Sequence, residues 1–171
     1  DNMYRSNMPT PQRIKKYKKL GIKTIINLRG GKKDGGWFLE KKACEQNGIE
    51  LVNLVARSRA APDKNMIFKA NAVFNSIKYP ALIHCKSGAD RAGLASVMYH
   101  LLVLNTPFPI ARKQLSLRFL HLKFSRSGIL DFMLDKYEKE QKISGLSFRS
   151  WIENKYDPVS YTHLTLPTTS V

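Results

Sequence analysis

The sequence predicts an α/β fold with a central, mostly parallel sheet flanked by helices. Two short stretches, Ile22–Leu28 and Ala81–Ile83, are apolar or β-branched without polar alternation. This pattern is typical of strands that are covered on both faces. Stretches with helix start and stop signals lie between the strand candidates. Strands that alternate with helices favour a parallel sheet, whose ligands bind beyond the carboxyl ends of the strands.

The first half of the chain contains three expected strands and two expected helices. Thr10 and Pro11 form a good helix start, and Gly21 forms a natural stop. A second helix begins near Trp37 and ends at Gly48. The expected elements in order are strand Met3–Ser6 at a sheet edge, helix Pro11–Gly21, strand Ile22–Leu28, helix Trp37–Asn47 and strand Ile49–Val55.

The second half begins with a helix for which Asp63 is a suitable N-cap. Its apolar residues recur at helical spacing and lie on one face: Ile67, Ala70, Phe74 and Ile77. The strand Ala81–Ile83 follows. After it we expect helices at Ala92–Leu104, Pro109–Leu120, Ile129–Glu140 and Phe148–Tyr156.

The length of 171 residues suits one domain with a buried core. We assign residues 1–158 to this domain. The C-terminal stretch VSYTHLTLPT resembles the translation of a sequencing-library adapter. We therefore expect residues 159–171 to be a non-native, adapter-derived tail that is not part of the domain.

The composition is strongly basic, with 29 Lys and Arg against 13 Asp and Glu and a net charge of +16. Such a charge attracts phosphorylated substrates or an anionic membrane surface, although a merely solvated surface explains it equally well. Nucleic acid is not an expected partner, because the basic residues of 112–118 lack interleaved aromatic side chains. The two cysteines indicate a reducing compartment, and we expect a cytoplasmic protein. An upstream targeting segment and the oligomeric state stay open.

The most informative stretch is PALIHCKSGADRAGL, residues 80–94. A strand leads into a tight loop that opens a helix, which is how α/β folds present backbone N–H groups to phosphate. Cys85 stands at the head of this loop and Arg91 at its end. The Arg91 guanidinium suits bidentate binding of a phosphate.

This arrangement predicts nucleophilic catalysis of phosphate transfer. The loop amides, the helix N-terminus and Arg91 favour the thiolate form of Cys85. That thiolate would attack phosphorus to form a cysteinyl-phosphate, which water then hydrolyses. We expect the phosphate to be held by the loop residues Lys86, Ser87, Gly88, Ala89, Asp90 and Arg91. No metal or other cofactor is expected.

The segment HCKSGADRAG resembles the His-Cys-x5-Arg signature of the protein tyrosine/dual-specificity phosphatase superfamily. Together with YRS, GIKTIINLRG and LSFRSWIE, it is similar to a bacterial dual-specificity-like branch. The resemblance implies a dual-specificity-phosphatase-like sheet flanked by helices, hydrolysis of phosphomonoesters and no cofactor. His84 matches a residue that helps hold the loop in that family, although it could also be an ordinary strand-end histidine.

Two departures from the family pattern leave the general acid open. Ala92 stands where the family usually has Ser or Thr, which implies slower turnover of the phosphoenzyme. The region 53–61, where the family usually carries its acid, has no carboxylate. Asp63 is the nearest candidate but also a good N-cap. Asp90 resembles the loop aspartate of myotubularins and Sac-type phosphatases, so we assign it as the catalytic acid. A structural partner of Arg91 or of a loop amide is its alternative role.

The substrate and the second cysteine also leave alternatives open. Lys86 inside the loop is similar to phosphatases that act on phosphoinositides, so a lipid or glycan phosphomonoester competes with a phosphoprotein as substrate. A catalytically weak phosphate-binding module is a further alternative. Cys44 is either a redox partner of Cys85 or, as its helical position favours, a small buried apolar residue.

Overall fold

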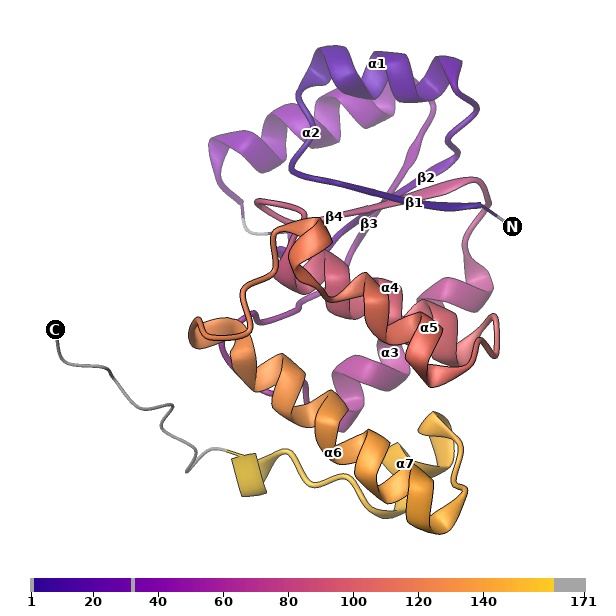
Figure 1. The fold of residues 1–171 in the computed structure, drawn as a ribbon. Helices are drawn as coiled ribbons and strands as arrows, with labels where there is room; N and C mark the ends of the chain where they lie inside the picture. Colours follow the sequence, from indigo (N-terminus) through magenta and orange to yellow (C-terminus); the bar gives the residue numbers. More distant parts are fainter. Residues whose placement is uncertain (1, 32, 162–171) are drawn as a thin grey trace, which may run out of the picture.

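The computed structural model describes residues 2–31 and 33–161. Its centre is a four-stranded sheet in which every pair of neighbouring strands is parallel. The strand order is β1-β4-β2-β3, so β4 lies inside the sheet and β1 at its edge (Figure 1). The strands are β1 (Met3–Ser6), β2 (Thr24–Asn27), β3 (Glu50–Asn53) and β4 (Ala81–His84). The predicted fold class and the edge position of the first strand are therefore confirmed.

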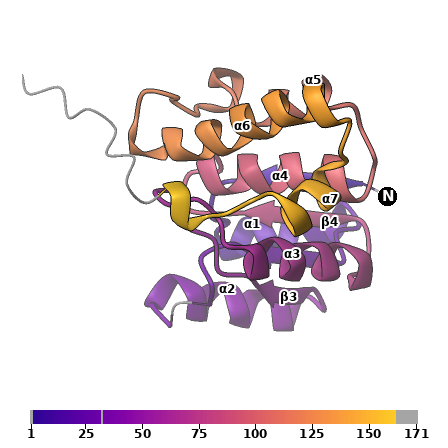
Figure 2. The same cartoon turned by 90° about the horizontal axis from the view of Figure 1, so that it is seen from below.

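Helices cover both faces of this sheet. α1 (Pro11–Lys19) and α2 (Gly35–Gln46) lie on one face, and α3 (Lys64–Ser76) and α4 (Asp90–Leu102) lie on the other (Figure 1). A further layer outside α4 contains α5 (Phe108–Ala111), α6 (Ile129–Ser144) and α7 (Phe148–Asn154). Figure 2 shows α6 on the side of α4 that faces away from α2. The site-bearing helix α4 is thus buried between the sheet and the outer helices.

Two of the predicted helix starts are confirmed by side-chain caps. Thr10 accepts a hydrogen bond from the backbone N–H of Arg13, and Asp63 accepts one from the N–H of Met66 at 2.7 Å. A cap of this kind contributes about 1 kcal/mol to helix stability. Asp63 is therefore engaged as the N-cap of α3.

Apolar side chains fill the space on both faces, which explains why β2 and β4 lack alternation. The smaller core lies under α1 and α2 and contains Ile14, Ile25, Cys44 and Leu82. The larger core lies between the sheet, α3, α4 and the outer helices, and includes Phe74, Met98, Leu134, Tyr137 and Trp151. Burial, with smaller contributions from Glu40 and Glu45, raises the pKa of Cys44 to about 12. Both cysteines are free thiols, and Cys44 packs as a small apolar residue.

The predicted helix Pro109–Leu120 is wrong. The four-residue helix α5 is followed by 3-10 turns at Arg112–Gln114 and Leu117–Phe119, and Leu120 adopts a left-handed φ of 61°. The carbonyls of Gln114 and Leu115 accept hydrogen bonds from the Arg5 and Arg112 side chains. A continuing helix would use those carbonyls for its own backbone bonds. Tertiary contacts therefore outweigh the local helical preference of this segment.

The predicted tail begins with a 3-10 turn at Val159–Tyr161. The rest of it, residues 162–171, lies outside the described residues. In the described part of the chain, every helix is too short or too polar to cross a membrane.

Candidate active site

The predicted strand, loop and helix meet at the carboxyl edge of the sheet. β4 ends at His84, Cys85 follows directly, and α4 begins at Asp90. Because β4 lies between β1 and β2, Cys85 emerges near the middle of the sheet edge. Its residue surface is only 1% exposed, so the thiol lies at the floor of the loop formed by residues 85–91, here called the phosphate loop.

The backbone of the phosphate loop turns back over the sulfur. The N–H of Gly88 donates a hydrogen bond to Cys85 Sγ at 3.2 Å. Gly88 has a φ of +81°, a conformation that favours glycine. A Cβ at this position would lie 2.8 Å from the carbonyl oxygen of Ser6. The loop therefore takes its shape partly from close contact with the end of β1.

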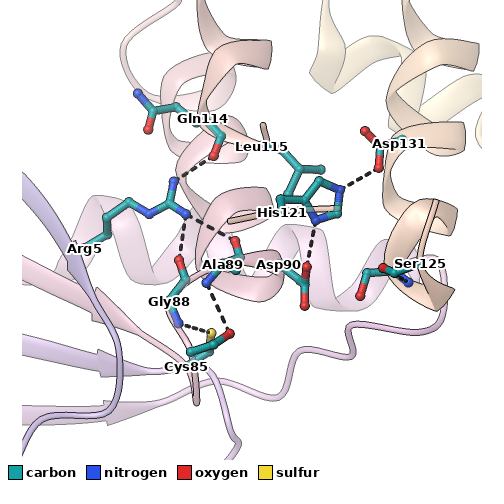
Figure 3. Close-up of polar contacts among 12 residues, drawn as sticks. Arg5, Cys85, Gly88, Ala89, Asp90, Gln114, Leu115, His121, Ser125 and Asp131 are labelled. Atoms are coloured by element: carbon teal, nitrogen blue, oxygen red, sulfur yellow. Dashed lines mark hydrogen bonds and ion pairs between the residues drawn. The ribbon is translucent and has the colours of Figure 1, made fainter. Parts of the chain in front are cut away.

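Arg5 on β1 fastens the loop from one side (Figure 3). Its guanidinium donates to the carbonyl of Gly88 at 2.6 Å, to that of Ala89 at 3.2 Å and to that of Gln114 at 2.7 Å. The same group lies 4.1 Å from the centre of the Phe119 ring. Burial lowers the pKa of Arg5, and the nearby Cys85 partly opposes this effect. Arg5 thus ties the loop to β1 and to the segment after α5.

A buried histidine–carboxylate pair supports the loop where it leaves the end of β4. His84 Nδ1 donates to the carbonyl of Cys85 at 3.1 Å, and Nε2 lies 2.5 Å from Glu40 Oε1. The other Glu40 oxygen accepts a hydrogen bond from the Asn27 side chain at 2.7 Å. All three side chains are almost completely buried. His84 therefore holds the backbone at the nucleophile, as the family resemblance implies.

A second histidine, His121, approaches the loop from the side opposite Arg5 (Figure 3). Its Nδ1 lies 2.7 Å from Asp90 Oδ1, and its Nε2 lies 2.6 Å from Asp131 Oδ2. The His121 and Asp131 side chains are buried, with exposures of 1% and 3%, whereas the Asp90 side chain is 26% exposed. Asp90 thus has a partner that the sequence did not indicate, the buried side chain of His121.

Further charged side chains hold Asp131, which lies at the end of the row Asp90–His121–Asp131. Arg112 donates to Asp131 at 2.6 Å and to Asp135 at 3.2 Å, and Lys123 contacts Asp135 at 2.9 Å. Burial lowers the pKa of His121, but hydrogen bonds to Asp131 and Asp90 outweigh it and leave the pKa raised. Burial raises the pKa of Asp131, but its bonds to His121 and Arg112 leave it lowered. The geometry therefore favours a charged His121 beside a charged Asp131.

The remaining predicted phosphate ligands lie on the loop itself. Lys86 and Ser87 are exposed, and Arg91 is half-buried as the second residue of α4. Within the described residues, the Arg91 guanidinium has no protein hydrogen-bond or ion-pair partner, so it is available to a ligand. Asp63, the alternative acid, caps α3 and lines a cavity of about 510 Å³ whose lining contains no residue of the phosphate loop.

Sequence reasoning missed three residues that support the phosphate loop: Arg5 and His121, which bond to it directly, and Glu40, which acts through His84. Glu40 lies between Leu39 and two lysines, so it looks like part of a solvated helix face. His121 lies 31 residues from Asp90, in a segment predicted to follow a helix that does not form. The sequence indicated Arg5 only as part of the YRS stretch, which contributes to the family resemblance. No group of three His, Cys, Asp or Glu side chains in the described part of the chain is arranged to hold a metal ion.

Comparison with protein families agrees with this geometry. Residues 2–106 match the family described as a DSP-PTPase phosphatase fused to NAD+ kinase. The chain belongs to this phosphatase family. The matched region contains Arg5, Glu40 and the whole phosphate loop, and it ends before His121 and Asp131.

Solved structures, several of them described as phosphatases, have folds similar to that of this chain. TpbA from P. aeruginosa aligns with a TM-score of 0.60 and 21% identity over 90% of this chain and 87% of that one. A TpbA variant in complex with phosphotyrosine aligns with a TM-score of 0.57 and 20% identity over 74% and 75% of the two chains. The core catalytic domain of the PP-IP phosphatase SIW14 from S. cerevisiae, in complex with citrate, gives 0.59 and 19% over 84% and 88%. At these identities the likeness shows the fold.

A comparison with curated proteins gives no match. The family match and the shared fold identify the protein as a phosphatase with a dual-specificity-like fold.

Proposed function

We propose that the protein hydrolyses phosphomonoesters of the tyrosine/dual-specificity type through a cysteinyl-phosphate intermediate. The observation that carries this proposal is the position of Cys85 at the floor of the phosphate loop, where the Gly88 N–H is donated to its sulfur. The amino end of α4 faces the same site, and its dipole favours an anion there. Arg91 is available to bind two phosphate oxygens together.

The reaction proceeds in two displacements. The Cys85 thiolate attacks phosphorus, an S–P bond forms, and the P–O bond to the leaving group breaks while its oxygen takes a proton. A water molecule then attacks phosphorus and loses a proton to the site, and the S–P bond breaks to regenerate the thiolate. Loop amides and Arg91 hold the other phosphate oxygens in both steps.

Asp90 is the proton donor in this proposal, and His121 is its positioning residue. Asp131 is held as a carboxylate by Arg112, so His121 Nε2–H donates to it. The Nδ1 proton of the charged histidine then lies on the 2.7 Å contact to Asp90. In the first displacement Asp90 passes this proton to the leaving oxygen. In the second it takes a proton from the attacking water and returns it to His121. Asp90 suits the exchange because it is the more exposed carboxylate of the array.

The phosphate loop and the relatives support a phosphorylated, strongly anionic substrate. The phosphotyrosine bound to TpbA supports a phosphorylated side chain as substrate, and the name of SIW14 supports a polyphosphorylated small molecule. The net charge of +16 and the exposed Lys86 favour a substrate that carries several negative charges.

Release of phosphate from p-nitrophenyl phosphate tests the proposal. Cys85→Ser should abolish turnover, because a hydroxyl in this site is a far weaker nucleophile than a thiolate. Cys44→Ser is the matched control and should leave turnover unchanged. Rapid quenching of the wild-type reaction should also reveal phosphate bound to the protein by mass spectrometry. Turnover that survives in Cys85→Ser contradicts the proposal.

Ala92 supports the second candidate, a weakly catalytic phosphate-binding module. This residue is fully buried and carries no hydroxyl to assist departure of the sulfur. A phosphoenzyme that forms in one turnover and then persists would favour this candidate. Ala92→Ser should then speed steady-state turnover without changing the first turnover.

A further inference from the structure

The segment from Leu117 to Arg126, here called the flanking segment, exposes apolar side chains beside the active site. The apolar side chains are highly exposed: Leu117 69%, Leu120 77%, Leu122 56% and Phe124 101%. Exposed leucines are ordinary when they are scattered singly over a surface. Here all four lie on one short segment, and such grouping marks an interaction surface.

The fold holds these side chains outward. Phe119 lies under the Arg5 guanidinium, and the His121 side chain is buried against Asp90 and Asp131. Leu120 and Leu122 alternate with these two anchors and therefore point away from the protein. Backbone hydrogen bonds close local turns, with Leu120 N–H donating to Leu117 at 2.8 Å and Ser125 N–H donating to Leu122 at 3.1 Å. The segment is a fixed feature of the site.

Leu120 is also placed at a conformational cost. Its φ of 61° lies in the left-handed region, where glycine and asparagine are favoured over a bulky apolar residue. The side chain is 77% exposed, so burial in the core repays little of this cost. Backbone strain of this kind persists at functional positions. The strained backbone and the exposed side chain together favour a binding role for Leu120.

Basic residues surround the apolar ones. Arg118, Lys123 and Arg126 are exposed on the same segment, and the acidic group beside them, Asp135, already pairs with Lys123 and Arg112. Resting on the proposed function, we propose that the flanking segment docks the enzyme on an anionic membrane, where its substrate is a phosphomonoester carried by that membrane.

A membrane fits this surface better than a groove-bound ligand does. Apolar side chains interspersed with Lys and Arg match the boundary between acyl chains and anionic headgroups. The cavities of about 510 and 520 Å³ beside Asp63 and beside Arg5 have none of the four apolar residues in their linings. Their exposures of 56–101% show that the apolar side chains project from the surface, as insertion into a membrane requires.

Docking of the flanking segment would also bring the phosphate loop close to the lipid headgroups. His121 lies within the flanking segment and contacts Asp90 at 2.7 Å, and Asp90 adjoins Arg91 on the phosphate loop. A membrane that receives Leu120 and Leu122 therefore presents its headgroups beside the phosphate loop. A soluble substrate reaches the phosphate loop without contacting the flanking segment. Its hydrolysis therefore should not depend on docking.

Co-sedimentation with phosphatidylcholine vesicles, with and without phosphatidylserine, tests the proposal. Wild-type protein should bind the vesicles that contain phosphatidylserine, and added salt should weaken binding. The double variant Leu120→Asn/Phe124→Asn should bind at least about tenfold more weakly. Leu20→Asn/Ile143→Asn is the matched control, since these residues are 74% and 88% exposed elsewhere on the surface. Leu120→Asn alone should not lower Tm, because asparagine tolerates the left-handed conformation.

Turnover of p-nitrophenyl phosphate should be equal in wild type and the double variant, which keeps the docking test separate from the catalytic test. Vesicle binding by a protein without phosphatase activity would support docking and refute the proposed function. Equal vesicle binding by the double variant and its control overturns the docking proposal. So does a wild-type dimer that the double variant dissociates, or selective loss of activity on soluble phosphotyrosine peptides.

Discussion

The phosphate loop is supported by two histidine–carboxylate pairs with different surroundings. His84 pairs with Glu40, and His121 pairs with Asp131. The second nitrogen of His84 bonds to the Cys85 backbone carbonyl, whereas that of His121 bonds to the Asp90 side chain. A carbonyl cannot exchange a proton at neutral pH, but a carboxylate can. A histidine–carboxylate pair thus holds the backbone rigid at one side of the loop, and in our proposal a second such pair supports proton transfer at the other side.

Asp90→Asn tests the proton-transfer side and should have the largest effect. An amide cannot deliver a proton, so we expect kcat to fall by about 10²–10⁴ for alkyl or phenyl phosphates, which have poor leaving groups. For p-nitrophenyl phosphate the loss should be much smaller, because its leaving group departs without a proton. Steady-state rates over a series of phenols measure the difference. Equal losses across the series would remove Asp90 from the acid role.

Glu40→Gln tests the rigid side. The substitution removes a buried charge next to His84, and breaking such a pair costs about 3–5 kcal/mol of the free energy of unfolding. Urea denaturation measures this loss. Glu45→Gln is the matched control on the exposed face of α2, where loss of the Lys41 pair should cost less than about 1 kcal/mol. Where Glu40→Gln stays folded, its activity should fall equally for good and poor leaving groups. A selective loss would give this pair a proton-transfer role.

His121→Gln should have the smallest effect on rate, about tenfold in kcat with KM unchanged, because the partly exposed Asp90 can still take up a proton from water and pass it on. It should also change the pH dependence of stability. The pKa of His121 is raised above 6.5 in the folded protein. Its contribution is therefore fully present below pH 6.5 and is lost as pH rises through the folded-state pKa. Tm should fall over this range in wild type and change less in His121→Gln. His100→Gln is the control, and identical profiles in all three proteins would contradict the charged state.

The sequence allowed prediction of the features that depend on local patterns. The doubly covered strands β2 and β4, the caps Thr10 and Asp63 and the strand–loop–helix around Cys85 were all recognisable from periodicity and residue type. The failures share a cause. Glu40, His121 and the ending of α5 depend on contacts between segments far apart in the chain, and neither spacing nor composition records such contacts.

Gly88 also has a consequence for how activity arises during folding. It packs against Ser6 and Asn7, and Met8 N–H donates to the Lys86 carbonyl at 3.1 Å, so the first described strand shapes a loop about eighty residues later. Nascent chains that have not paired β1 with β4 hold the nucleophile without its cradle. Such immature molecules would therefore be inactive, and the appearance of turnover during refolding would report the pairing of β1 with β4.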